Sequence, residues 1–202
     1  HFRMPKAVPV EFVSSSEALP DAFEKLRASQ VVGLDTESHH QGGLTLLQLA
    51  TDEHVFLVDV LALSGCAVLG GLLAKLLEDS GVTKLSFGGT QDVKMVYQLP
   101  CLRESKQALA AHVDVQRLAA EKRKEKSKEE LSLKEAMHGL SLASLSQDVL
   151  GKPLNKEMTG SDWAFRPLSK AQTEYAALDA WILVRLFAKL TPPQREARLR
   201  EA

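Results

Sequence analysis

The sequence predicts an α/β fold in which helices pack on a mixed sheet of five strands. Three apolar, strand-like runs follow one another closely, and such short connections favour antiparallel hairpins. A helical segment then separates the third run from a fourth, and a helix between two strands suggests a parallel crossover. The last third of the chain is helical in pattern. This order of elements describes a layered structure of helices against a sheet.

The first predicted element is a helix over residues 16–28. Its apolar side chains Leu19, Phe23 and Leu26 recur at helical spacing, and the serine at position 16 is suited to cap it. Turn signals, the pair Gly42-Gly43 and a polar triplet, separate the next three runs. We expect strands there, at residues 31–35, 44–50 and 54–59.

Helix and strand alternate in the middle of the chain. Leucines at helical intervals predict a helix over 68–77, which leads through an Asp-Ser-Gly turn into a fourth strand at 82–87. Residues 90–99 are helical in pattern, and Pro100 ends that helix. The fifth strand is short and ends near Val113, where an aspartate comes next in the sequence to cap the following helix.

A block of charged residues, 121–130, continues that helix and contains no apolar side chain. We interpret this charged insertion as a solvated helix extension or a mobile loop. A nucleic-acid patch is the weaker alternative, because acids interleave with the bases. Downstream, residues 142–150 predict a helix that stops at a glycine, and 152–167 predict an ordered loop. A last helix, capped by Ser169, runs to about Leu190 and is closed by two prolines.

Bulk composition limits the function classes. The 202 residues fit one domain over 1–202, with residues 1–15 as a possible extension. A formal net charge of −1 gives no global signature of a nucleic-acid binder, so such contacts must use local patches. Two cysteines form neither a disulfide framework nor a zinc spacing. Without a membrane-spanning run or a signal peptide, we expect an intracellular protein, cytoplasmic or nuclear, with no membrane partner.

Acidic residues at special spacings point to a metal site. Asp35 and Glu37 lie at i and i+2 on the first predicted strand and point to one side, and Tyr175 and Asp179 lie at i and i+4 on a helix and do likewise. Asp35 is at the carboxyl end of its strand, where open α/β sheets place ligands. Asp92 begins a helix that faces the same sheet end. Carboxylates repel one another unless cations neutralise them, and hard oxygen ligands suit magnesium or manganese.

Each of these residues also has an ordinary interpretation. An Asp-Thr-Glu sequence can be a solvated strand end, and Asp92 can complement the positive end of its helix. Tyr175 and Asp179 can belong to a common amphipathic helix. None of these interpretations predicts the presence of the other acids. The alanines around Asp179 favour the metal site, because small residues let a helix approach a sheet closely.

Together these residues resemble the three motifs of the DEDDy 3′–5′ exonucleases, the superfamily of ribonuclease D and the Werner helicase exonuclease domain, and especially the Nibbler-type domains. The resemblance covers nearly the whole chain. It is carried by Val-Gly-Leu-Asp-Thr-Glu at 32–37, by 44–51, 55–63, 84–94 and 150–156, by Trp163 and 166–168, and by Tyr-Ala-Ala-Leu-Asp at 175–179. Ser38-His39-His40 departs from the family, which often has an aromatic residue there. We interpret the two histidines as an exposed loop pair rather than as metal ligands.

This resemblance implies a ribonuclease H-like fold with helices on both faces of the five-stranded sheet. It implies a metal-dependent 3′–5′ exonuclease that hydrolyses single-stranded RNA or DNA to nucleoside monophosphates, using two Mg²⁺ or Mn²⁺ ions about 4 Å apart. Asp35 would bridge both ions, and Glu37 and Asp179 would complete the site of the ion that activates water. Asp92 would hold the second ion, largely through bound waters. Tyr175 would orient the attacking water.

The 3′ end of a strand needs cations at the rim of this acidic site. Our candidates around the third motif are Lys152, Lys156, Arg166 and Lys170, with Lys94 as a weaker one. Trp163 and Phe165 are candidates for stacking on terminal bases. For Trp163, core packing between loop and helix is the stronger interpretation, because an aromatic side chain in an ordered loop usually anchors it.

The sequence also bears on two other function classes. A catalytically weak or inactive relative could bind RNA or a protein partner on the same scaffold. A nucleotide-binding Rossmann domain is excluded, because no glycine-rich turn follows the first strand. RNA and DNA both stay open as substrates, since the contact that reads the 2′-hydroxyl would come from a loop. Flanking domains, protein partners through them, and the oligomeric state stay open as well.

Overall fold

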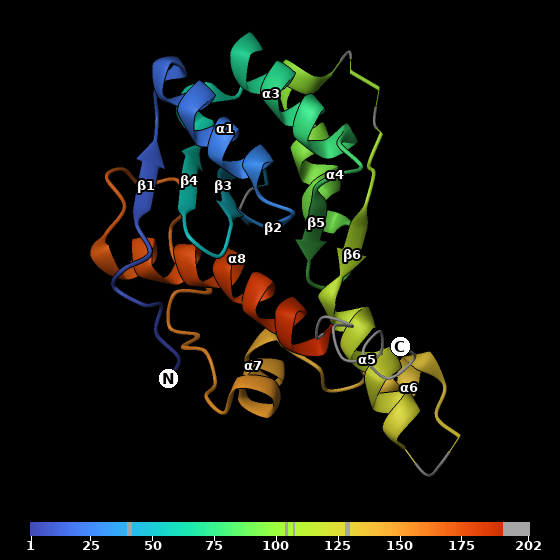
Figure 1. The fold of residues 1–202 in the computed structure, drawn as a ribbon. Helices are drawn as coiled ribbons and strands as arrows, with labels where there is room; N and C mark the ends of the chain where they lie inside the picture. Colours follow the sequence, from blue (N-terminus) through green and yellow to red (C-terminus); the bar gives the residue numbers. More distant parts are fainter. Residues whose placement is uncertain (40–41, 104, 107, 128–129, 192–202) are drawn as a thin grey trace.

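A mixed six-stranded sheet forms the centre of the molecule, with strand order β1-β4-β3-β2-β5-β6 (Figure 1). The computed structural model describes residues 1–39, 42–103, 105–106, 108–127 and 130–191. The strands are β1 Val10–Val13, β2 Val31–Ser38, β3 Leu44–Ala50, β4 Val55–Asp59, β5 Thr83–Ser86 and β6 His112–Asp114. Pairing is antiparallel for β2 with β3 and for β3 with β4, and parallel for the other three pairs. The predicted mixed α/β sheet is confirmed.

Strand β1 is the sixth strand, and the sequence did not predict it. It is only four residues long, too short for an alternating pattern to stand out. Its place is set by parallel pairing with β4, in which Val10 lies opposite Val55. A long-range pairing of this kind leaves no local signal. Residues 10–13 of the possible extension therefore belong to the sheet.

Helices cover both faces of the sheet, as predicted. They are α1 Leu19–Ala28, α2 Val60–Leu63, α3 Ala67–Glu78, α4 Gln91–Tyr97, α5 Val115–Lys126, α6 Leu133–Met137, α7 Leu142–Leu150 and α8 Lys170–Leu190. One buried core lies between the sheet and α1, α3 and α4. A second core lies between the other face and α5, α7 and α8 (Figure 1).

Most helix ends lie where the local sequence signals predict them. Asp114 accepts a hydrogen bond from the Gln116 amide at 2.9 Å and caps α5. Ser169 caps α8 within a capping box, and Gly151 ends α7 at φ 79°. Ser16 does not cap α1, because a 3₁₀ turn at Ser16–Ala18 precedes the helix. The prolines after α8 lie outside the described residues.

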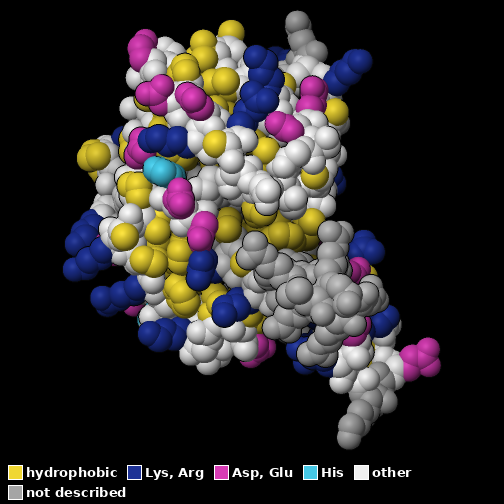
Figure 2. All heavy atoms as spheres, viewed as in Figure 1, with side chains coloured by type: hydrophobic (Ala, Val, Ile, Leu, Met, Phe, Trp, Pro, Cys, Tyr) yellow, Lys and Arg dark blue, Asp and Glu magenta, His cyan; other side chains and the backbone are white. Residues whose placement is uncertain are grey.

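The charged block of residues 121–130 extends α5 as far as Lys126. Its exposed ion pairs lie within the helix, with Arg117 Nε 3.0 Å from Glu121 Oε1 and Lys122 Nζ 3.1 Å from Glu125 Oε2. The predicted helix extension is confirmed over this range. On the face shown in Figure 2, basic and acidic side chains are interspersed, in keeping with the small net charge.

Candidate metal centre

Asp35 and Glu37 lie within β2, which extends to Ser38 rather than ending at Asp35 as predicted. Glu37 therefore keeps the strand alternation, and both carboxylates point to the sheet face that α8 covers. Gly33 makes this close packing possible, because a Cβ at that position would lie 2.1 Å from the carbonyl oxygen of Ala180. The neighbour of Ala180 on α8 is Asp179, so the glycine brings the third acid over the strand.

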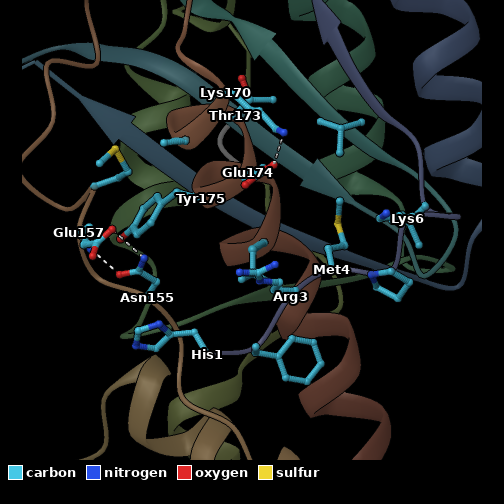
Figure 3. A pocket seen from close by; sticks show the side chains of 17 residues that line it. His1, Arg3, Met4, Lys6, Asn155, Glu157, Lys170, Thr173, Glu174 and Tyr175 are labelled. Atoms are coloured by element: carbon cyan, nitrogen blue, oxygen red, sulfur yellow. Dashed lines mark hydrogen bonds and ion pairs between the residues drawn. The ribbon is translucent and has the colours of Figure 1, made fainter.

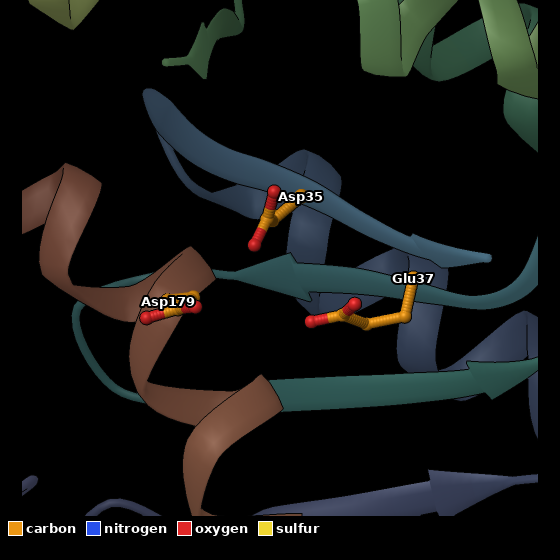
Figure 4. Close-up of side chains that lie close together, drawn as sticks. All are labelled: Asp35, Glu37 and Asp179. Atoms are coloured by element: carbon orange, nitrogen blue, oxygen red, sulfur yellow. The ribbon is translucent and has the colours of Figure 1, made fainter. Parts of the chain in front are cut away.

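Three of the four predicted acids come together in space. Carboxylate oxygens of Asp35, Glu37 and Asp179 all lie within 4.8 Å of one another (Figure 4). Two come from β2, near one end of the described chain, and one comes from α8, near the other. In the described part of the chain no histidine joins this group, and His40 lies outside the described residues.

Burial and mutual repulsion favour the protonated forms of these acids. Burial raises the pKa of Asp35 well above its ordinary range, and the neighbouring carboxylates, Asp179 first, raise it further. Burial, followed by the charge of Asp179, raises the pKa of Glu37 to about 8. Burial raises the pKa of Asp179 to about 7, against a hydrogen bond from Tyr175 that lowers it. Three ionised carboxylates at this site need positive charge beside them.

Asp92 lies in the first turn of α4 and outside this group of three. Its Oδ1 accepts a hydrogen bond of 2.5 Å from Thr36 Oγ1, the hydroxyl between the two acids of β2. Burial raises the pKa of Asp92, and its charge in turn raises the pKa values of Asp35 and Glu37. Asp92 is thus an electrostatic neighbour of the cluster whose side chain is held by Thr36.

Tyr175 stands one helical turn before Asp179 on α8. Its hydroxyl lies 3.3 Å from Thr159 Oγ1, and its ring lies 5.9 Å from the ring of Trp163. Burial, followed by the charge of Asp179, raises the pKa of the Tyr175 phenol. The phenol therefore keeps its proton at neutral pH and is able to donate a hydrogen bond.

Comparison with known proteins matches this architecture to one family. The family model described as 3′–5′ exonuclease matches residues 10–193. The chain belongs to the 3′–5′ exonuclease family. This exonuclease domain is of the ribonuclease D and mut-7 type, which confirms the family expected from the motifs.

Individual relatives agree with the assignment. The exonuclease mut-7 homolog of Homo sapiens is 35% identical over 82% of this chain, and ribonuclease D of Escherichia coli is 30% identical over 89% of it. The crystal structure of the Aedes aegypti Nibbler EXO domain matches with a TM-score of 0.75 and 28% identity, covering 99% of this chain and 92% of that one. The exonuclease domain spans only 20% of the human relative and 44% of the bacterial one.

The side chains of two proposed nucleic-acid contacts, Trp163 and Arg166, face the interior of the domain. Trp163 is 2% exposed and packs on Tyr175, so its ring is not available to stack on a base. Arg166 Nη2 lies 2.8 Å from Asp59 Oδ1 and donates to the carbonyl oxygen of Thr45. It fastens the loop before α8 to the ends of β3 and β4. In contrast, Phe165 is 64% exposed.

The four lysine candidates are exposed but scattered. Lys152 and Lys156 belong to the loop after α7, and Lys94 lies on α4. Lys170 begins α8, and its Nζ is 3.8 Å from Glu174 Oε1. Lys170 also lines a groove of about 850 Å³ between the N-terminal segment and the start of α8 (Figure 3).

Sequence reasoning missed this groove. Arg3 and Lys6 line it together with Lys170, and Tyr175 contributes to its wall. Hydrogen bonding fixes the N-terminal segment, since the amide of Phe2 donates to the carbonyl oxygen of Pro153 at 2.8 Å. Glu157 and Glu174 are the acids of the lining. A groove assembled from distant segments leaves no sequence pattern, although two bases in the first six residues were a weak signal.

Proposed function

We propose that the exonuclease domain hydrolyses single-stranded nucleic acid, RNA in the first place, from the 3′ end and releases nucleoside monophosphates. The observation that carries this proposal is the largely buried cluster of Asp35, Glu37 and Asp179, in a chain whose residues 10–193 match the exonuclease family. RNA comes first because the bacterial relative is a ribonuclease D. DNA is the alternative substrate.

The donor set fits two hard divalent cations, Mg²⁺ or Mn²⁺. All the candidate donors are carboxylate oxygens, which suit these ions. Burial and the neighbouring carboxylates raise the pKa values of Asp35 and Glu37, so a cation beside them would favour their ionised forms. Asp35 would serve both ions, with Glu37 and Asp179 at one and Asp92 at the other. When bound, the ions supply a lowered pKa for the attacking water and positive charge at the phosphate oxygens.

Tyr175 acts in this proposal as a hydrogen-bond donor. Its phenol keeps the proton at neutral pH, and its hydroxyl contacts both Thr159 and the Asp179 carboxylate. From that position it orients the attacking water without removing a proton from it. Thr36 supports Asp92 by a hydrogen bond from the opposite face of β2.

The groove beside Tyr175 is our candidate path for the strand. Arg3, Lys6 and Lys170 place positive charge along it, and apolar side chains such as Met4 and Met158 line it as well. The phosphates of the strand would contact these basic side chains, and its nucleobases would pack against the apolar lining. The exposed ring of Phe165 is a further candidate for base stacking.

The wider setting is also a proposal. The exonuclease domain spans less than half of the length of these two curated relatives, and we propose that flanking domains supply protein partners. We propose an intracellular location, cytoplasmic or nuclear. None of the helices in the described residues is long and apolar enough to cross a membrane.

The test is cleavage of end-labelled single-stranded RNA and DNA of equal sequence, with free and blocked 3′ ends, in Mg²⁺, Mn²⁺ or chelator. We expect stepwise shortening of the free 3′ ends only, and only with metal. Cleavage of a blocked strand, or equal cleavage in chelator, would contradict the proposal. A preference for DNA would change the substrate but not the chemistry.

A second candidate is a binding module with little turnover on the same scaffold. The orientation of Asp92 favours it, because its carboxylate is bonded to Thr36 and is not part of the three-acid group. Titration calorimetry with Mn²⁺ separates the two, when it is combined with the cleavage assay. Saturable heat without cleavage would support the binding module.

A further inference from the structure

Gln48 is a buried polar side chain for which the fold provides no partner. It lies in the middle of β3 with 0% exposure, and neither Oε1 nor Nε2 has a hydrogen-bond partner in the part of the chain that the structure describes. Leaving such a group unpaired destabilises the folded state, because its hydrogen bonds to water are lost and none replaces them. Buried polar groups in native cores are nearly always hydrogen-bonded, so an unpaired one points to a further role.

The place of Gln48 in the sheet supplies one. In the antiparallel pairing of β2 with β3, Gln48 lies directly opposite Asp35. Such residues point to the same face, with Cβ atoms about 4.5–5.5 Å apart. That face is the one covered by α8, which carries Asp179. The Gln48 side chain therefore lies beside Asp35, on the same sheet face as the acid cluster.

Other neighbours of Gln48 on this face offer little to its amide. Leu46 and Ala50 precede and follow it on the same side of β3, and Leu57 lies opposite it on β4. Their side chains are apolar. Among the directly paired residues, Asp35 alone carries a side-chain acceptor for the Nε2 hydrogens.

We infer that Gln48 is a positioning residue for Asp35, and that its Nε2 donates a hydrogen bond to the Asp35 carboxylate when that carboxylate binds a cation. The inference rests on the proposed function, since it concerns the ion-binding state. A carboxylate that holds a cation needs its remaining lone pairs directed, and partners of this kind typically change metal affinity by about 10–100-fold. This hydrogen bond would give the otherwise unpaired amide of Gln48 its partner.

The test uses Gln48→Met, which keeps the side-chain length and removes both polar atoms. We expect the Kd for Mn²⁺, measured by titration calorimetry, to rise about tenfold or more. We expect kcat to fall with KM for the strand unchanged. The melting temperature of the metal-free protein should stay the same or rise, because an unpaired buried amide is removed. Gln147→Met, at an exposed position on α7, is the matched control and should change none of these values.

The outcomes separate this inference from the proposed function. Equal Mn²⁺ affinity and equal kcat in wild type and Gln48→Met overturn the positioning role. If Gln48→Met does not fold, Gln48→Asn withdraws the amide by one methylene and should show the same loss of affinity; an unchanged affinity there overturns the inference too. Absence of Mn²⁺ binding in the wild type overturns the proposed function itself.

Discussion

The acid cluster and the neighbouring groove meet at Tyr175, yet they are built in different ways. The cluster consists of half-buried and buried side chains on β2 and α8, held by a backbone contact at Gly33. The groove has exposed bases on a terminal segment and a helix start. Buried charges in close contact act as a unit, whereas exposed charges act singly and weakly. Single substitutions in the cluster should therefore abolish cleavage, whereas single substitutions in the groove should weaken strand binding only in part.

The largest effect is expected from removing a cluster acid. Asp35→Ala or Asp179→Ala should lower kcat by about 10³-fold or more, because several kcal/mol of charge stabilisation depend on the bound ions. Single-turnover cleavage of labelled RNA measures this. Asp148→Ala, at an exposed position on α7, is the control and should be fully active. Normal cleavage by Asp35→Ala would show that the cluster is not the reactive site.

The next effect tests the backbone contact that assembles the cluster. Gly33→Ala places a Cβ 2.1 Å from the Ala180 carbonyl oxygen, so α8 must move away from β2. We expect a loss of about 1–3 kcal/mol in unfolding free energy, as for overpacking, together with weaker Mn²⁺ binding. Urea unfolding and calorimetry measure the two. Gly71→Ala, which has open space around it in α3, should lose neither stability nor affinity.

The pH dependence of stability distinguishes a cluster without ions from one that holds them. The folded pKa of Glu37 is about 8, above its ordinary 4.5, and that of Asp179 is about 7, above 3.8. Because the folded state then binds more protons than the unfolded one, the metal-free protein should lose stability as pH rises from about 4 to about 8. Saturating Mn²⁺ should reverse this trend. Melting temperatures in chelator and in Mn²⁺ measure it, and Glu37→Gln should flatten the chelator curve.

The smallest effect is expected in the groove. Arg3 and Lys6 form no ion pair with any described residue, so they are free to meet phosphates. The double substitution Arg3→Ala/Lys6→Ala should leave kcat unchanged, weaken strand binding several-fold and reduce the salt slope of the binding constant by about 1.4. Fluorescence anisotropy at several salt concentrations measures this. Lys75→Ala, on α3 across the sheet, should behave as wild type, and an unchanged slope in the double variant would place the strand elsewhere.

This comparison also explains what could be read from the sequence. The resemblance to the family's motifs predicted that Asp179 meets Asp35 and Glu37, and strand periodicity made those two predictable as neighbours. The orientation of Asp92 was not, since it depends on the Thr36 hydroxyl of another element. The catalytic and metal-binding roles of all five motif residues stay predictions.

The binding surface was harder to predict, because exposure in a loop depends on tertiary contacts. Arg166 reads as a basic residue in a polar loop, but its guanidinium bonds to Asp59, which ends β4. Trp163 is buried by the same inward turn of the loop. Strand β1 and the groove depend on pairings with distant segments. Gln48 did leave a signal, because it is the one amide within the otherwise apolar run 46–50. Its burial without a hydrogen-bond partner became visible only in the structure.

The contact between Gly33 and Ala180 also has a consequence for protein synthesis. A ribosome that has made β2 to β6 has released two acids of the cluster, but the third acid lies on α8, the last described helix, which also completes the second core. Contacts of such sequence separation form late and slowly. The nascent chain therefore cannot bring the three acids together before α8 has been made, so a partly made chain lacks the proposed metal centre.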